Sequence, residues 1–339
     1  MPLVPKVGRK KWKIKFILIG ITSLMWIGVA LHLFPVWWAF VLSISPAWEA
    51  YEIPPPLFPR HPTFMVYKYW LFTGEVSGQI FKQYSFLIYL KNSVILAAGT
   101  IAIQIPIIAL AAYSLSKLHS SKWSRVLFLF FIGTMLVPGQ LSLVPRYLLL
   151  YHFPFATANV PHIPFIKKVF PTFNFMDTYW AVILPAIYSA FHLLLFKGFF
   201  DTIPDSIIQA ARLDGASELS IFGRIVFPVS KPVFAVVGYF AFTTSWNQFL
   251  WPLIVLKEKS KIPLSVALYE LQEMGFAASH MTEELWDRIV GRQGMPVAIT
   301  TPTVNIVMAL AIIQGIPMFI AFIIFREQIM KGIKLRGFK

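Results

Sequence analysis

Long apolar segments, each about the length of a membrane-crossing helix, dominate this sequence. An α-helix needs roughly 20 predominantly apolar residues to cross the hydrocarbon core of a bilayer. Only 13% of the residues are charged, whereas soluble globular proteins carry about 25%. We therefore predict an all-α polytopic membrane protein whose six transmembrane helices cover residues 14–34, 92–115, 126–145, 178–196, 232–256 and 303–325.

The basic residues predict how these helices are oriented. Most of the 30 Lys and Arg residues fall on the chain ends and on short connections, where positive charge favours the cytoplasmic side. We expect both termini in the cytoplasm, and we interpret the basic residues as topology signals and lipid anchors rather than as a nucleic-acid surface. The first apolar segment continues past residue 34, which argues against a secretory signal peptide. Four parts follow: a basic N-terminus (1–13), a first helix with a Pro-rich outer segment (14–91), a core of five helices (92–325) and a basic tail (326–339).

The polar residues inside the predicted helices limit the possible functions. None of the 15 Asp and Glu residues lies there, and the only ionisable groups apart from lysines at the edges are His32 and His192. Transporters coupled to protons or sodium usually keep acids in the membrane. The chain has no cysteine, no Walker-type glycine loop, no metal-ligand cluster and no recognisable catalytic constellation. We predict a transport protein without enzymatic activity, metal or cofactor, driven by a partner; a secondary transporter or a membrane-embedded enzyme is a less favoured alternative.

A polar-edged segment, residues 203–228, separates two of the apolar segments. It contains Gln209-Ala210-Ala211, then three residues before Gly215, nine more before Ile225, and Phe227-Pro228. We expect a helix capped by Asp205 or Ser206, with a narrow face of small and apolar side chains. Gly215 permits a left-handed backbone conformation, a second short helix can cover residues 218–226, and Pro228 and Pro232 should end it.

This spacing resembles the loop that marks permease subunits of binding-protein-dependent ABC importers, with Gln209 in place of the family Glu and Phe227 in place of the family Leu. In that family the loop is the coupling helix that docks on the cytoplasmic ATPase. The alternative is a surface hairpin that only connects two spans. The resemblance implies an ATPase-coupling role for Gln209, Ala210, Ala211, Asp214, Gly215, Ile225 and Pro228.

Softer motifs outside this loop look like those of the maltose-type carbohydrate branch of the family. They are Met135–Pro138 with Pro145-Arg146-Tyr147, Asp177–Pro185, Trp246–Leu253 and Gln328–Lys339. The resemblance implies the type I ABC importer fold in a bacterial or archaeal cell membrane. It also implies two cytoplasmic ATP-binding subunits, a second permease subunit, an extracytoplasmic solute-binding protein and a carbohydrate solute, which we expect to be an oligosaccharide. A non-sugar solute, such as a peptide or polyamine, remains the alternative.

A row of polar residues in the fifth predicted helix is the candidate translocation path. It comprises Thr244, Ser245, Trp246, Asn247 and Gln248. Amide side chains can donate to and accept from sugar hydroxyls, and Trp246 and Trp251 offer flat faces to a sugar ring. The same residues could instead bond neighbouring helices. His192 has the same two interpretations: it lines the path, or it bonds a carbonyl of a neighbouring helix.

Overall fold

The computed structural model describes residues 12–50, 52–68, 86–118, 122–153, 173–279 and 304–335. Within these ranges the chain is helical, apart from connecting turns and an isolated β-bridge between Phe153 and Phe173. The predicted basic N-terminus lies almost wholly outside the described residues, as do the end of the tail and residues 69–85, 154–172 and 280–303 of the outer segments. Contacts group the chain into two units, residues 1–82 with 271–313 and residues 83–270 with 314–339.

The first unit contains α1, a 32-residue helix over Trp12–Ser43. Most of its apolar side chains are exposed, as expected of a helix whose apolar surface faces lipid. Two short helices follow, α2 at Ala47–Ala50 and α3 at Met65–Lys68. The buried Glu49 carboxylate accepts the backbone N–H groups of Arg60 at 2.6 Å and His61 at 3.1 Å. This contact holds the Pro-rich segment after α2 in place.

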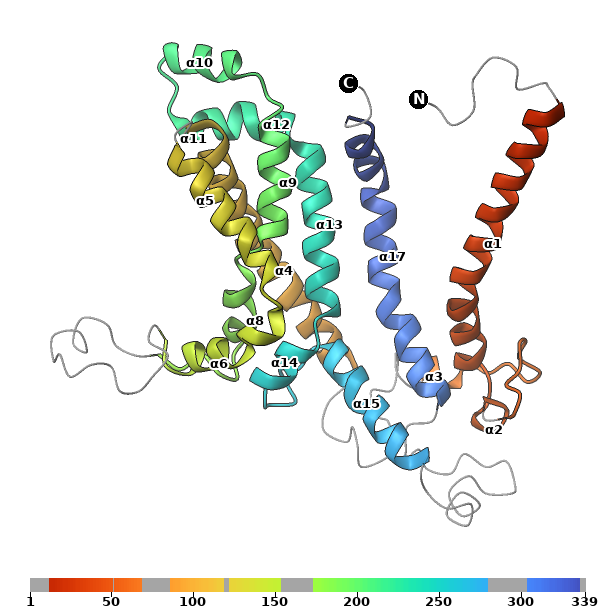
Figure 1. Ribbon diagram of the computed structural model, residues 1–339. Helices are drawn as coiled ribbons and strands as arrows, with labels where there is room; N and C mark the ends of the chain where they lie inside the picture. The colour runs from red at the N-terminus through yellow and green to blue at the C-terminus, as the bar shows by residue number, and fades with distance from the viewer. Residues whose placement is uncertain are drawn as a thin grey trace. The chain divides into compact units, whose positions relative to one another are not determined.

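The second unit is organised around three packed helices: α4 (Phe86–Tyr113), α9 (Ala190–Phe200) and α13 (Lys231–Asn247). In Figure 1 they lie beside one another, with α5 (Lys122–Gly133) next to α9. A buried apolar core fills one end of this bundle and includes Ile108, Phe196, Phe200, Val226 and Val237. The remaining elements outside residues 203–228 are η2 (Ser114–Leu118), η3 (Thr134–Leu136), η4 (Gly139–Ser142), α6 (Leu143–Tyr151), α8 (Tyr179–Ala186), α14 (Leu250–Val255), α15 (Leu264–Ser279) and α17 (Val304–Leu335).

In the part of the chain that the structure describes, three helices are long and apolar enough to cross a membrane alone: Ile14–Ser43, Phe86–Leu118 and Val304–Gln328. Three bent helix pairs raise the number to as many as six if each pair forms one span. The predicted helical membrane fold is therefore confirmed, and the helices are consistent with six spans. The third bent pair, Glu218–Val229 with Lys231–Asn247, also includes residues of the segment 203–228, which the sequence places outside the membrane.

The third predicted helix, residues 126–145, is wrong as a continuous element. α5 and η3 end at Leu136, and the next helical stretch leaves at an angle of 98°. Val137 is extended (φ −85°, ψ 117°) and precedes Pro138, as expected because a proline ring disfavours helical geometry in the preceding residue. Pro145, predicted to end the span, lies inside α6.

The fourth and fifth predicted helices are also interrupted. α8 and α9 meet at a 44° bend after Pro185. Proline lacks the N–H that would bond the carbonyl four residues earlier, here that of Ala181. The buried indole N–H of Trp251 donates to that oxygen at 2.9 Å. α13 ends at Asn247, and Gln248 after it is extended, so the predicted helix 232–256 is two helices, α13 and α14.

Candidate coupling segment and translocation path

Residues 203–228 form a helix, a tight turn and a second helical stretch, as the spacing predicts. α10 covers Asp205–Leu213, and Gly215 follows with a φ of +79°. Most residues with a Cβ avoid this left-handed region. The second stretch comprises α11 (Glu218–Ile221), η5 (Phe222–Val226) and α12 (Phe227–Val229).

Two details of the predicted boundaries are wrong. The N-cap of α10 is Pro204, which offers no capping side chain, and Asp205 is already the first helical residue. Pro228 does not end the second stretch. It lies in the first turn of α12, where a missing N–H costs little. The chain bends by 83° between α12 and α13, at Ser230.

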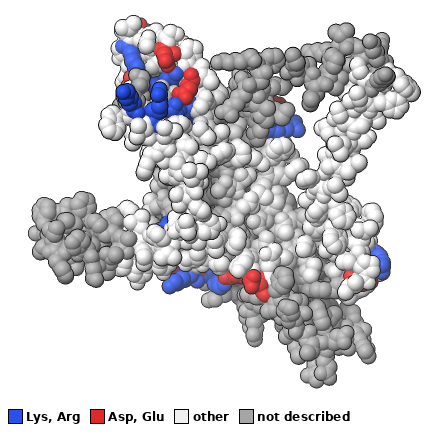
Figure 2. Space-filling view, in the orientation of Figure 1, with Lys and Arg blue, Asp and Glu red and all other residues white. Residues whose placement is uncertain are grey.

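Apolar packing fixes one face of the segment to the bundle. Ile208 and Ala211 of α10 are buried in the same core as Ala112 and Phe200. The opposite face is open, because Leu213 is 90% exposed and Leu219 of α11 is 73% exposed. Figure 2 shows Lys, Arg, Asp and Glu side chains gathered around this end of the unit, next to a largely uncharged surface. The segment thus presents exposed apolar side chains, Leu213 and Leu219 foremost, beside charged residues.

The predicted coupling residues divide between these two faces. Gln209, Ala210, Asp214, Gly215 and Pro228 are exposed, Ile225 is half-buried, and Ala211 is buried. The narrow face expected from the sequence is therefore split: Ile208 and Ala211 face the bundle, whereas Ile207, Ala210 and Asp214 are open.

Lys117, near the end of α4, ties the start of the segment to the bundle. Its Nζ donates to the carbonyl oxygen of Ile203 at 2.7 Å and to Asp205 Oδ1 at 2.6 Å. The Lys117 side chain is 4% exposed and the Asp205 side chain 73% exposed. Arg212 Nη2 donates to the backbone oxygen of Lys117 at 3.1 Å. Lys117, in the η2 turn that follows α4, therefore holds both ends of α10.

Glu218 provides a second attachment. Its carboxylate accepts the Tyr113 hydroxyl at 2.6 Å and Arg212 Nε at 2.7 Å. The pKa of Glu218 is lowered, first by the N–H of Arg212 and then by the Tyr113 hydroxyl. The same carboxylate raises the pKa of Arg212. Ser116 Oγ donates to Asp201 at 2.7 Å, so the chain just before the segment is held to α4 as well.

The sequence analysis missed these attachment residues. Lys117, Tyr113 and Glu218 are not among the predicted site residues. The partners are 86 to 105 residues apart in sequence, so no local pattern relates them. The sequence feature that could have indicated these contacts is a complementary charge pattern. A lysine follows one apolar segment, and acids lie at both ends of α10 and at the start of α11.

The predicted path residues differ in their surroundings. Thr244 and Asn247 are exposed, and Ser245 and Gln248 are half-buried. Asn247 Nδ2 lies 3.0 Å from the sulfur of Met318. Trp246 is buried, and its indole N–H donates to the Gln314 oxygen at 3.0 Å. The two tryptophans expected to face a sugar, Trp246 and Trp251, therefore pack inside the second unit. Of the predicted path residues, Thr244, Asn247 and Gln248 keep polar side chains that are at least partly accessible.

His192 contacts a side chain rather than a helix carbonyl. Its Nδ1 lies 3.1 Å from Gln104 Oε1 on α4, and Gln104 Nε2 donates to the oxygen of Ala186 at the break between α8 and α9. The side chains of His192 and Gln104 are both buried. The amide bridges a histidine and a carbonyl left without a helical partner.

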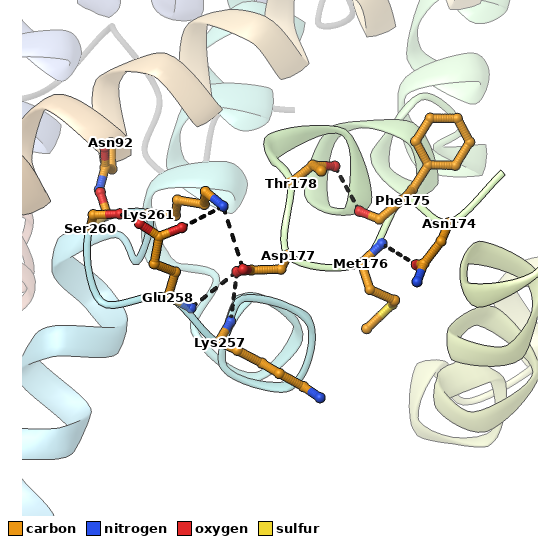
Figure 3. Close-up of polar contacts among 10 residues, drawn as sticks. All are labelled: Asn92, Asn174, Phe175, Met176, Asp177, Thr178, Lys257, Glu258, Ser260 and Lys261. Carbon is orange, nitrogen blue, oxygen red and sulfur yellow. Dashed lines mark hydrogen bonds and ion pairs between the residues drawn. The ribbon is translucent and has the colours of Figure 1, made fainter.

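A polar network holds the turn after α14 (Figure 3). Asp177 has a φ of +58°, and its Oδ1 accepts the N–H groups of Lys257 at 2.9 Å and Glu258 at 3.0 Å. Lys261 Nζ lies 3.4 Å from Asp177 Oδ2. Burial raises the pKa of Asp177, but the two backbone N–H groups and Lys261 outweigh it, so this pKa is lowered.

Asn92 of α4 completes the network. Its Nδ2 donates to the backbone oxygens of Ser260 at 2.8 Å and Ile262 at 2.9 Å, while its Oδ1 accepts the Tyr179 hydroxyl at 2.7 Å. The turn is thus fixed to α4 and α8. Among the described residues no cluster of three or more His, Asp or Glu side chains could hold a metal ion.

Comparisons with known proteins agree with this architecture. The chain is 27% identical over 296 residues to the sn-glycerol-3-phosphate transport system permease protein UgpE of Escherichia coli, covering 87% of this chain and 94% of that protein. It is 28% identical over 193 residues to the polygalacturonan/rhamnogalacturonan transport system permease protein YtcP of Bacillus subtilis, covering 57% and 63%. A crystal structure of a bacterial ABC transporter involved in the import of the acidic polysaccharide alginate matches with a TM-score of 0.66 at 20% identity, covering 94% of this chain and 98% of that one.

The family comparison identifies the region that carries the function. The model of the binding-protein-dependent transport system inner membrane component matches residues 104–278. This range contains the last part of α4, all of α9 and α13, the segment at residues 203–228 and the predicted path residues. The chain is a multi-pass membrane permease, and it belongs to the family of inner membrane components of binding-protein-dependent transport systems.

Proposed function

We propose that this chain is one of two permease subunits in an ATP-driven importer of a carbohydrate. Two cytoplasmic ATP-binding subunits supply the energy, and an extracytoplasmic solute-binding protein delivers the solute. Both termini and the segment at residues 203–228 face the cytoplasm of a bacterial or archaeal cell. The observation that carries this proposal is the two-sided character of α10 and α11: one face is anchored to α4, and the other presents Leu213 and Leu219.

The anchored face suits force transmission. When the ATP-binding subunits close, they displace α10 through its open face, which includes Gln209, Asp214 and Gly215. Lys117 and Glu218 pass that displacement to α4, because their hydrogen bonds join the segment to the end of this helix. Since α4, α9 and α13 share one packed core, the bundle moves as a body. Alternating access then follows from rocking this bundle against the partner permease.

Two observations support a carbohydrate as the solute. The named relatives transport glycerol phosphate or polygalacturonan, and the matched crystal structure belongs to an importer of alginate. In this chain Thr244, Ser245, Asn247 and Gln248 place hydroxyl and amide groups at the end of α13. Such groups donate to and accept from sugar hydroxyls. Trp246 contributes by fixing this end of α13 to α17 rather than by facing the sugar.

The test is co-expression with a partner permease, the ATP-binding subunit and the solute-binding protein, followed by ATP-driven uptake into proteoliposomes. Leu213→Glu places a charge on the open face without disturbing the core, because Leu213 is almost fully exposed. We expect it to abolish co-purification of the ATP-binding subunit and uptake, whereas the matched Leu213→Met variant keeps both. Uptake by this chain without any ATP-binding subunit would refute the proposal.

A further inference from the structure

Arg146 is a half-buried cation that forms no ion pair among the described residues. It lies on α6, on the same face as the buried Leu150, while Val144 and Leu148 on the other face are exposed. Its guanidinium carbon is 5.2 Å from the centre of the Trp251 ring, and Nη2 donates to Ser142 Oγ at 3.1 Å. The arginine therefore points toward the unit rather than out from the exposed face of α6.

The surrounding sequence offers Arg146 no counter-charge. There is no Asp or Glu between Glu75 and Asp177. Asp177 is engaged by Lys261 and by two backbone N–H groups. Glu258, whose backbone N–H bonds Asp177, pairs with the same lysine. A partly desolvated guanidinium normally has a carboxylate or phosphate partner, so the arrangement is incomplete as it stands.

Trp251 gives the guanidinium a fixed platform. The indole is buried, and its N–H is held by the oxygen of Ala181. A guanidinium has five N–H donors in one plane, and one hydrogen bond, to Ser142, is formed. A cation stacked on an aromatic face keeps its remaining donors at the ring edge, where they can bind a planar carboxylate in a bidentate manner.

We propose that Arg146 binds an acidic group of the solute, so that the importer carries an acidic saccharide such as an oligouronate. This inference rests on the proposed function. A phosphate of a lipid headgroup has the same chemistry, but a lipid contact would be expected on the exposed face of α6 that carries Val144 and Leu148. The two sources of the anion are separated by whether the effect follows the charge of the solute or that of the bilayer.

The experiment uses the complete assembly in proteoliposomes with two probes of the same size, trigalacturonate and its neutral methyl ester. Arg146→Met removes the charge but keeps an unbranched side chain on Trp251. Losing a hydrogen-bonded charge pair corresponds to about a 10-fold or larger loss, so we expect Arg146→Met to lower trigalacturonate uptake by at least that factor. Uptake of the ester should be unchanged. Lys257→Met, which removes an exposed charge near Asp177, should affect neither probe.

Each alternative has a distinct result. Equal loss of both probes in Arg146→Met would assign the arginine a structural role and overturn the inference, as would an effect that follows the anionic lipid content of the vesicles. If the unchanged assembly takes up the ester but not trigalacturonate, the inference fails while the proposed function stands. If it takes up neither saccharide in the presence of ATP, the carbohydrate function fails, and the inference fails with it.

Discussion

Replacing Tyr113 by Phe tests whether the segment at residues 203–228 is held to α4 by the hydrogen bond to Glu218. The change removes one hydroxyl, whose oxygen lies 2.6 Å from Glu218 Oε2. The ring stays in place, because it is buried and lies 5.5 Å from Phe222. The perturbation therefore removes the hydrogen bond between α4 and α11, together with the interaction of this hydroxyl with Arg212.

The expected cost follows from the exposure of the acceptor. A hydrogen bond to a charged group contributes about 1.5–3 kcal/mol. The Glu218 side chain is 40% exposed and keeps its pair with Arg212, so water replaces part of the lost interaction. We expect a loss of about 1 kcal/mol, which is roughly a fivefold increase in the population with the segment detached.

Hydrogen exchange of the full chain in nanodiscs measures this population. The amides of α10 and α11 should exchange about fivefold faster in Tyr113→Phe, with α9 and α13 unchanged. Tyr239→Phe is the matched control, since no hydrogen bond of its hydroxyl occurs among the described residues. Unchanged exchange in the segment, or an equal increase throughout the bundle, would show that Tyr113 does not attach the segment to α4.

Three further outcomes follow from the contacts. The pKa of Glu218 is lowered in the folded state by Arg212 and Tyr113. These two contacts therefore stabilise the segment fully above the ordinary glutamate pKa of about 4.3, and the stabilisation is lost as the pH falls through the lowered pKa of the folded state. The protection factors of the α10 amides, which are exchange rates corrected for the intrinsic effect of pH, should be constant from pH 8 to 5 and fall only in acid, and Glu218→Gln should remove this dependence. A Cβ on Gly99 would lie 2.8 Å from Cδ1 at the end of the Ile183 side chain. Turning that side chain is offset in part by the higher helix propensity of alanine, so Gly99→Ala should lower the free energy of unfolding by no more than about 1 kcal/mol, and Ile183→Val should relieve that loss. Trp251→Phe leaves the Ala181 carbonyl unpaired, which should lower the free energy of unfolding by about 1–3 kcal/mol beyond the loss of packing. The loss should be smaller in a Pro185→Ala background, because the alanine N–H can then bond this carbonyl within the helix. Equal losses in both backgrounds would contradict this account.

The sequence alone was sufficient for the features that depend on local chemistry. Apolar length identified the helical membrane fold, and the spacing around Gly215 located a helix, a left-handed turn and a second helix. These follow from properties of single segments: hydrocarbon thickness, the conformational freedom of glycine and the need of the backbone for hydrogen bonds. The family match over residues 104–278 covers the same region.

Helix breaks could not be predicted in the same way, because proline has different consequences in different surroundings. Pro106 and Pro317 lie inside continuous helices, whereas a 98° bend follows the helical turn before Pro138. A membrane helix tolerates a proline when neighbouring groups satisfy the backbone atoms it leaves unpaired. Those neighbours come from distant parts of the chain, so a local pattern does not reveal them.

The predicted sugar platforms illustrate the same point and indicate how such a path should be sought. Polar or aromatic character inside an apolar segment selected Trp246 and Trp251, but both indole N–H groups are engaged by backbone carbonyls. An unpaired carbonyl in a low-dielectric interior is costly. Polar side chains inside a membrane protein are therefore often hydrogen-bonded to backbone carbonyls and are then not free to bind a solute. Candidate path residues are then the polar groups left accessible after this accounting, such as Thr244 and Asn247, together with Arg146, for which the described residues provide no carboxylate.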